Sequence, residues 1–327
     1  MINANNIILQ TQKSPFRIMV GKEITDLVRS WRFILLLALV LLTFAASMYI
    51  SVANIRSAFN NTQDPDHAFL YLKLLTNTDG SMPPFHILLS FLAPLLGISM
   101  GFDAINTELN AGTLTRLVAQ PIYRDNILLA KIYSPMVIIT TLFFSLSLLM
   151  IGSGLLITGV RIEPQELMRI IGFMLATIIY IAFYLSLSIL FSIIFRQAAT
   201  SALSVLGIWL FFTVFYPMLV NLAVRALMPD PAYLSQSEIM GYNELILNIL
   251  RVAPNQLYSD AATTLLMPSV RSLGPMNMEQ LSGAIPAPLP LKESIMIVWP
   301  QISGMVACSV SCFALAYYLF MRREIRN

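Results

Sequence analysis

Six stretches of this sequence are long, apolar and free of Asp, Glu, Lys and Arg, and they restrict the fold more than any other feature. They cover residues 33–54, 85–102, 132–160, 170–195, 198–224 and 294–321. A helix needs about 20 mainly apolar residues to cross a bilayer, and only the second stretch is slightly short. The sequence therefore predicts an all-α membrane protein in which one transmembrane domain, residues 1–327, contains six transmembrane helices.

The composition supports the same class of protein. Hydrophobic residues make up 57% of the chain and charged residues 11%, whereas soluble domains contain about 25% charged residues. The net charge of +3 is small, and no basic cluster is interleaved with aromatic residues. We therefore expect the lipid bilayer as a partner and no nucleic acid.

The distribution of Lys and Arg predicts the orientation. Six spans place both termini on one side, and basic residues are enriched in cytoplasmic loops. Twelve basic residues fall on the side of the termini: Lys13, Arg17, Lys22, Arg29, Arg32, Arg116, Arg124, Lys131, Arg196, Arg322, Arg323 and Arg326. The other eight are spread over the longer loops opposite. We expect a multi-pass protein of the cytoplasmic (inner) membrane with both termini in the cytoplasm.

The connections between the spans also contain helical patterns. The stretch GKEITDLVRSWRF, directly before the first span, is amphipathic and predicts an elbow helix in the headgroup plane, or else a straight extension of that span. The outward loops cover residues 55–84, 161–169 and 225–293. In the last of them, SEIMGYNELILNILRVAP and NQLYSDAATTLLMPSV predict two interfacial helices, an outward helical hairpin before the last span. That hairpin could equally be a plain surface element with no role in substrate handling.

Several familiar site patterns are missing from the sequence. It has no GxxxxGK[ST], HExxH or GxSxG, and no paired carboxylates within a span, so we expect a transport subunit that is not an enzyme and has no catalytic residues. We also expect no metal site and no cofactor site in this chain. Cys308 and Cys312 are expected to pack in the core rather than bind a metal, and His67 and His86 to be surface histidines.

The loop 103–131, between the second and third spans, has an ordered pattern of its own. Gly112 can adopt a positive φ and end a helix that continues from the second span. Thr113 is a suitable N-cap for a short amphipathic helix, Pro121 ends it, and Arg124 begins the next helix. The apolar face of that short helix is formed by Leu114, Leu117 and Val118. Such a helix can bind in a groove of a soluble partner.

These residues resemble a known family. The chain reads Glu108-x-x-x-Gly112-Thr113-Leu114-x-x-Leu117-x-x-x-Pro121-Ile122-x-Arg124, followed by Lys131. This pattern resembles the first cytoplasmic loop of ABC-2 type transporter permeases, with Ala130 in place of the usual Gly before the lysine. The six spans, the elbow, the internal termini and the long last outward loop are also similar, so the resemblance covers essentially the whole chain.

The resemblance implies a permease subunit of an exporter whose P-loop ATPase is a separate chain that carries the ATP and Mg. It also implies pairing with a second permease copy or a paralogue. The short helix would be the coupling helix that contacts the ATPase. Glu108 would brace its base against Arg116 or Arg124, unless it is a solvated helix charge. The residues implied in coupling are Glu108, Gly112, Thr113, Leu114, Leu117, Pro121, Arg124 and Lys131.

Two further questions stay open at the level of sequence. Small and polar residues of the second and fifth spans could line a central dimer interface or could serve helix packing; they are Ser90, Ser99, Ser201, Ser204, Gly207, Thr213 and Asn221. An alternative function is an ABC-type membrane module that moves no cargo and acts mechanically on an extracytoplasmic partner. A stand-alone carrier or membrane enzyme is disfavoured, because no charged residue lies within a span.

Overall fold

The computed structural model describes residues 15–59, 69–76, 83–114, 123–227, 235–269 and 289–322, and this part of the chain is helical and contains no strand. The long helices are α2 (Trp31–Phe59), α4 (Phe85–Gly101), α7 (Arg124–Thr158), α8 (Pro164–Ile194), α9 (Ala198–Leu210) with its continuations η2 (Phe211–Phe215) and α10 (Tyr216–Leu227), and α14 (Leu291–Arg322). The shorter helices are α1 (Pro15–Val28), α3 (Leu70–Thr76), α5 (Asn106–Asn110), α11 (Gln236–Leu250) and α12 (Pro254–Leu266).

Six helical segments of the described part are long and apolar enough to cross a membrane, which confirms the predicted six-span, all-α fold. They are Trp31–Ala53, Phe85–Asn110, Arg124–Ile157, Pro164–Ile194, Ala198–Ala226 and Leu291–Arg322. The fourth begins earlier than the apolar stretch at 170, so the predicted turn 161–169 is shorter. Pro164 at the first helical position and a capping box formed by Glu163 and Glu166 start α8 there.

α8 forms the centre of the bundle. Its window of highest hydropathy is 72% buried within the protein. α4 crosses it closely, because Gly97 and Gly101 lie one helical turn apart on the contacting face. A Cβ on Gly97 would lie 2.7 Å from the Ile181 carbonyl oxygen, and one on Gly101 would lie 2.9 Å from Ser188 Cβ. Such small residues allow two backbones to approach, and α4 and α8 therefore pack closely at these two positions.

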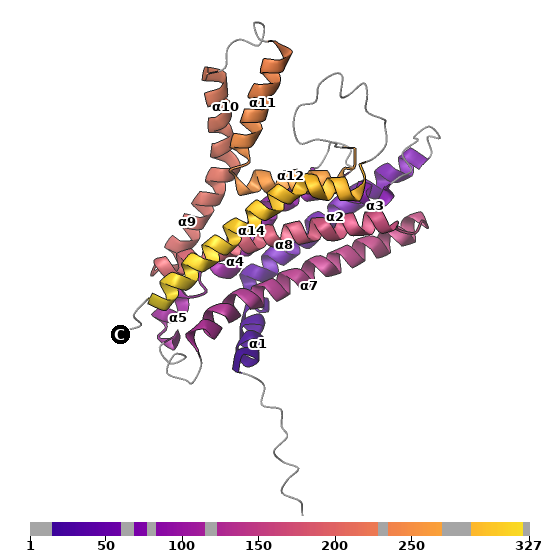
Figure 1. The fold of residues 1–327 in the computed structure, drawn as a ribbon. Coiled ribbons are helices and arrows are strands. Elements are labelled where there is room, and N and C mark those ends of the chain that lie inside the picture. Colours follow the sequence, from indigo (N-terminus) through magenta and orange to yellow (C-terminus); the bar gives the residue numbers. More distant parts are fainter. Residues whose placement is uncertain are drawn as a thin grey trace, which may run out of the picture.

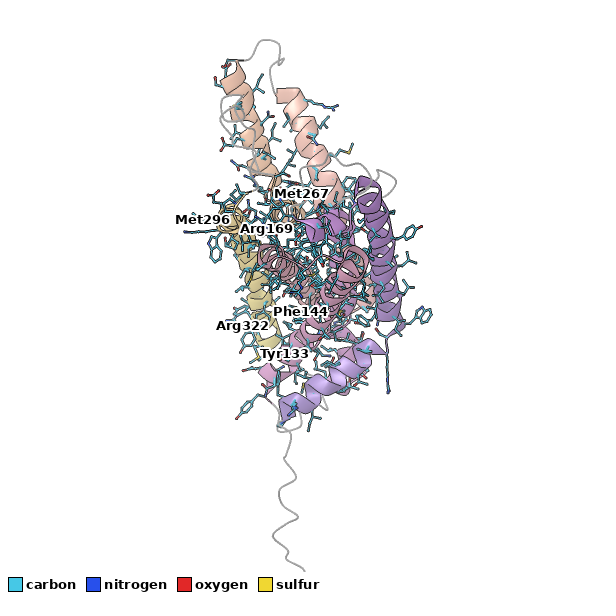
Figure 2. The ribbon with its side chains drawn as sticks, turned by 90° about the vertical axis from the view of Figure 1, so that its right-hand side faces the viewer. Tyr133, Phe144, Arg169, Met267, Met296 and Arg322 are labelled. Atoms are coloured by element: carbon cyan, nitrogen blue, oxygen red, sulfur yellow. The ribbon has the colours of Figure 1, made fainter. Side chains whose placement is uncertain are left out.

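The bundle has two ends, which we name the coupling end and the distal end. The coupling end comprises residues 102–114, the first turn of α7 and the last turn of α8. The distal end comprises α3, α12 and the first turn of α14. Figure 1 shows α1 and α5 at the coupling end, and α3 and α12 beside the opposite end of α14. Figure 2 places Tyr133 and Arg322 toward the coupling end, and Arg169, Met267 and Met296 toward the distal end.

The two helices predicted in the last outward loop are present as α11 and α12, but they differ in burial. α12 is packed into the distal end against α8 and α14, and its Tyr258, Ala261 and Leu265 are buried. α11 lies beside α10, and the two form a helix pair that projects from the bundle (Figure 1). The polar residues of α12 pair internally, because Asp260 accepts hydrogen bonds from Arg251 and Gln256, and the interfacial position of the two helices stays a prediction.

α1 precedes the first span as a separate helix that ends before Trp31, at a turn closed by the Ser30 hydroxyl. It packs along α7 through Met19 and Val20. Its exposed face carries Arg17, Ile18 and other residues that do not contact the bundle. The predicted elbow position in the headgroup plane stays a prediction.

Candidate functional site at the coupling end

The second span ends at a bend that sets the path of the loop 103–131. α4 ends at Gly101, a turn follows, and α5 continues to Asn110. Gly112 then adopts a φ of +67°, which confirms the predicted left-handed helix end. No atom of the described chain lies within 4 Å of a Cβ built at Gly112, so glycine is favoured there for its backbone conformation.

A buried ion cluster joins α5 to two other helices. The Lys131 ammonium on α7 lies 2.9 Å from Glu108 Oε1 and 3.2 Å from both carboxylate oxygens of Glu23 on α1. The Lys131 side chain is 5% exposed, and the two glutamates are 13% and 14% exposed. Lys22 lies at the edge, 3.7 Å from Glu108. Two carboxylates compensate the desolvation of the lysine, and the loss of Lys131 would leave two partly buried carboxylates close together.

A second set of bonds fixes the same segment to the end of α8. Ser192 Oγ accepts hydrogen bonds from the backbone N–H groups of Ile105 and Asn106, at 2.9 and 3.2 Å. The Asn110 side chain donates to the Arg196 carbonyl at 2.8 Å. Residues 105–110 are therefore held to α8 by neutral hydrogen bonds and to α1 and α7 by charged ones.

A more exposed ion pair closes the first span onto this region. Arg32, at the start of α2, donates to Asp103 at 2.6 Å and places its guanidinium 4.7 Å from the ring of Phe102. Its side chain is half exposed, so this pair is expected to contribute little to stability.

The structure brings some of the residues implied in coupling together and does not describe others. Glu108 and Lys131 are brought together at 2.9 Å, and the bracing of Glu108 by Arg116 or Arg124 stays a prediction. Arg124 begins α7, as predicted, and lies 5.9 Å from the ring of Phe320. Arg116, Leu117 and Pro121 lie outside the described residues.

Two residues at the base of the predicted coupling helix have other contacts than expected. Leu114 is 1% exposed and packs within the hydrophobic core, so it is not available to a partner. The Thr113 hydroxyl donates to the Glu108 carbonyl oxygen at 3.1 Å, which closes the preceding helix. Whether Thr113 also caps the next helix depends on residues 115 and 116, outside the described part of the chain.

Sequence reasoning missed Glu23, Ser192 and the close contact of α4 with α8. Glu23 and Ser192 are distant in sequence and carry no pattern of their own. The pair Gly97 and Gly101, in contrast, forms a GxxxG motif within an apolar stretch, and this signal was readable. The seven small and polar residues of the second and fifth spans do not form one surface: Ser201 is buried, whereas Asn221 is exposed, and Ser90 and Ser99 bond to their own helix.

The histidine and cysteine expectations can be compared with the structure in part. His86 is 4% exposed and its Nδ1 lies 3.4 Å from the Leu75 carbonyl oxygen, so the expectation of a surface histidine is wrong for it, and His67 lies outside the described residues. Cys312 packs against the core, whereas Cys308 is exposed on α14. Within the described residues, no group of three or more His, Cys, Asp or Glu side chains could hold a metal ion.

The chain is similar in sequence to known proteins. A family model described as ABC-2 family transporter protein matches residues 17–325. The chain is also 25% identical over 254 residues to a protein described as probable ABC transporter permease protein NosY of Pseudomonas aeruginosa, with 76% of this chain and 82% of the relative covered. The match spans both the six helices and the coupling end. The chain therefore belongs to the ABC-2 family of transporter proteins, as a permease subunit of an ABC transporter.

Proposed function

We propose that the chain is the membrane-spanning subunit of an exporter whose energy comes from ATP hydrolysed on a separate P-loop ATPase subunit. The observation that carries this proposal is the buried cluster of Lys131, Glu108 and Glu23, which ties the base of the loop 103–131 to two helices of the membrane domain. The sequence contains no P-loop, so the nucleotide and its Mg would be bound by the partner.

The coupling end has the contacts that a force-bearing connection needs. A displacement of the loop 103–131 would be transmitted to α1 and α7 through Lys131, and to α8 through Ser192. Because α4 and α8 pack backbone against backbone at Gly97 and Gly101, they would move as one body. In the proposed orientation this end and both termini lie in the cytoplasm, in line with the excess of Lys and Arg there.

The contact with the ATPase is proposed to involve the middle of the loop. Leu114 is buried in the permease itself, so the partner is proposed to contact Leu117 and Val118, the other two residues of the predicted apolar face. The roles of Gly112, Thr113, Pro121 and Arg124 are to shape and position this helix.

A second permease copy, or a paralogue, is proposed to pack against the fifth span. The window of highest hydropathy in α9 to α10 is only 11% buried within the chain. Its exposed surface continues from Leu203 and Leu210 to the polar Asn221 and Arg225. Polar side chains are unfavourable against lipid, and they favour protein contact on this face.

The proposal is tested by co-purification with an ATPase. The chain is co-expressed with a candidate P-loop ATPase subunit, and the tagged permease is isolated from membranes. Leu117→Asp is expected to abolish recovery of the ATPase, because an ionised carboxylate cannot enter an apolar groove. Thr25→Asp, on the exposed face of α1, is the control and is expected to retain the ATPase. Unchanged recovery with Leu117→Asp would remove the proposed coupling contact.

A further inference from the structure

A buried arginine lies at the end of α8 opposite to Ser192. Arg169 is 0% exposed and belongs to the second turn of α8. Its Nη1 donates to the Leu265 carbonyl oxygen at 3.2 Å and to Ser294 Oγ at 3.1 Å, and its Nη2 donates to the Leu289 carbonyl oxygen. Sequence reasoning placed Arg169 in an outward loop, because it directly precedes the apolar stretch. The structure makes it part of the fourth span.

No carboxylate neutralises this charge within the described residues. Glu166, one turn earlier on α8, is bonded instead to the backbone N–H groups of Tyr71 and Glu163. The acceptors of Arg169 are neutral, although Leu265 lies in the last turn of α12, where the helix dipole favours a cation. A buried cation with neutral acceptors is stable only while all of them stay in place. The guanidinium is therefore sensitive to any shift of the groups around it.

The three acceptors belong to two elements that Arg169 holds together. Leu265 lies at the end of α12, and Leu289 and Ser294 lie at the start of α14. The Leu289 N–H also donates to the Pro268 carbonyl oxygen at 2.9 Å, so the chain leaving α12 and the chain entering α14 run side by side. The planar guanidinium bonds to both. Arg169 thus attaches the neck formed by residues 265–269 and 289–294 to α8.

One helix connects this neck with the coupling end. Ser192 follows Arg169 by about 35 Å along α8 at the usual rise per residue. It accepts two backbone hydrogen bonds from the base of the loop 103–131. Between these two points, α8 contains neither proline nor a break, and α4 is packed tightly against it. A displacement at one end of such a helix is passed to the other end with little loss.

We propose that Arg169 is the positioning residue through which movement of α8, started by the ATPase at the coupling end, is passed to α12 and α14 at the distal end. The inference rests on the proposed function and adds the route that the movement takes. Without the guanidinium, α8 would still follow the coupling loop, but the neck would follow α8 only through the packing of α12 and α14.

The test uses the permease with its ATPase in lipid nanodiscs, with Cys308 and Cys312 replaced by Ala. Single cysteines report on each end: Tyr123→Cys, at an 81% exposed residue of the coupling end, and Lys292→Cys, at an exposed residue of the neck. Their rates of labelling by a maleimide are measured without nucleotide and with ATP plus vanadate. In the parent protein both rates are expected to change severalfold.

Arg169→Met is expected to leave the nucleotide response at position 123 intact and to weaken it at position 292. Arg169→Lys is expected to restore part of the distal response, because one ammonium can reach some of the three acceptors. Arg161→Met removes an exposed positive charge close to the start of α8 and is expected to change neither response. A purely structural role would weaken both responses together or neither. A full distal response in Arg169→Met would overturn the proposal.

Failure of the proposed function gives a different result. If position 123 does not respond to nucleotide in the parent protein, the coupling to an ATPase is itself contradicted and this inference falls with it. If Arg169→Met does not assemble, Ser294→Ala keeps the guanidinium and removes one acceptor. A weaker distal response with an intact response at position 123 then supports the proposal, and an unchanged distal response overturns it.

Discussion

The fourth and fifth spans follow each other in the chain and have similar hydropathy. Among the six spans, the fourth is the most buried within the protein and the fifth is the least buried. The window of highest hydropathy is 72% buried in Pro164–Ile194 and 11% buried in Ala198–Ala226. α8 is enclosed by α4, α12, α14 and α9, whereas α9 to α10 packs on the rest of the chain mainly along one side. Apolar composition therefore predicts insertion in a membrane and does not predict whether protein or lipid covers the helix.

The two spans also treat their polar side chains differently. In α8, Tyr180 donates to the Ser90 carbonyl oxygen, Ser188 donates to the Ile98 carbonyl oxygen, and Thr177 contacts Tyr258. In the fifth span, Trp209 Nε1 and Thr213 Oγ1 are buried and have no hydrogen-bond partner in the described part of the chain. Thr213 lies in the π-helical segment η2, a type of irregularity that is frequent at functional sites, and Trp209 lies in α9 two residues before it. These side chains of α8 bond to other helices, although the Tyr184 hydroxyl and Arg169 Nε of α8 are also buried without a partner among the described residues.

The largest expected difference concerns one glycine facing α8 and one on α9. Gly97→Ala places a Cβ 2.7 Å from the Ile181 carbonyl oxygen, and we expect a loss of roughly 1–3 kcal/mol in the free energy of unfolding. At Gly207 a Cβ meets no described atom within 4 Å, so Gly207→Ala is expected to stabilise the helix by up to about 1 kcal/mol. Thermal unfolding of both variants in detergent measures the two effects. Shifts of equal sign would break the comparison.

The second prediction asks what covers the fifth span. Leu203 on α9 and Leu148 on α7 are 69% and 70% exposed, and they form a matched pair. In a background free of native cysteines, Leu203→Cys is expected to yield a cross-linked dimer in membranes with a bifunctional maleimide. Leu148→Cys is expected to remain monomeric on a denaturing gel. Cross-linking at neither position would assign the exposed face of α9 to lipid. Cross-linking at both positions would contradict a contact specific to α9.

The third prediction compares two threonines. Thr177 donates to the Phe173 carbonyl oxygen and shares a hydrogen bond with Tyr258, so Thr177→Val is expected to lower the free energy of unfolding by about 1 kcal/mol. The Thr213 hydroxyl has no such partner among the described residues. Thr213→Val is therefore expected to be neutral or slightly stabilising in the isolated chain. A loss in Thr213→Val only when a second copy is present would assign the missing partner to that copy.

The smallest expected effect is a pH dependence of the free energy of unfolding, caused by Tyr258 in the contact between α8 and α12. Burial raises the pKa of the Tyr258 hydroxyl well above its usual range. Above about pH 10 the unfolded chain releases this proton and the folded chain keeps it. The folded state then binds more protons, so stability falls as the pH rises. Tyr258→Phe should show a shallower loss of stability above that pH, as judged by chemical denaturation. An identical slope would contradict the assignment.

The sequence predicted those parts of this molecule that depend on local chemistry. Stretches without charge located the spans, and Gly112 located a left-handed turn, because both are consequences of nearby residues alone. The closure of the coupling end could not be predicted, since Glu23 reaches Lys131 only once α1 has packed on α7. Arg169 was assigned to a loop because it precedes the apolar stretch, although it is buried among partners supplied by distant segments. Contacts between side chains that are distant in the sequence leave no local pattern from which they could be predicted.

The hydrogen bond from the Leu289 N–H to the Pro268 carbonyl oxygen has a practical consequence for protein engineering. It holds Pro268 and Leu289, the residues that flank the stretch 269–288, next to each other at the distal end. The length of chain between these residues can therefore change without a change in the distance that α12 and α14 must keep. An affinity tag or a small fluorescent domain inserted between them should leave the bundle intact. Such an insertion would give a handle on the intact complex and a reporter of the side of the membrane on which the neck lies.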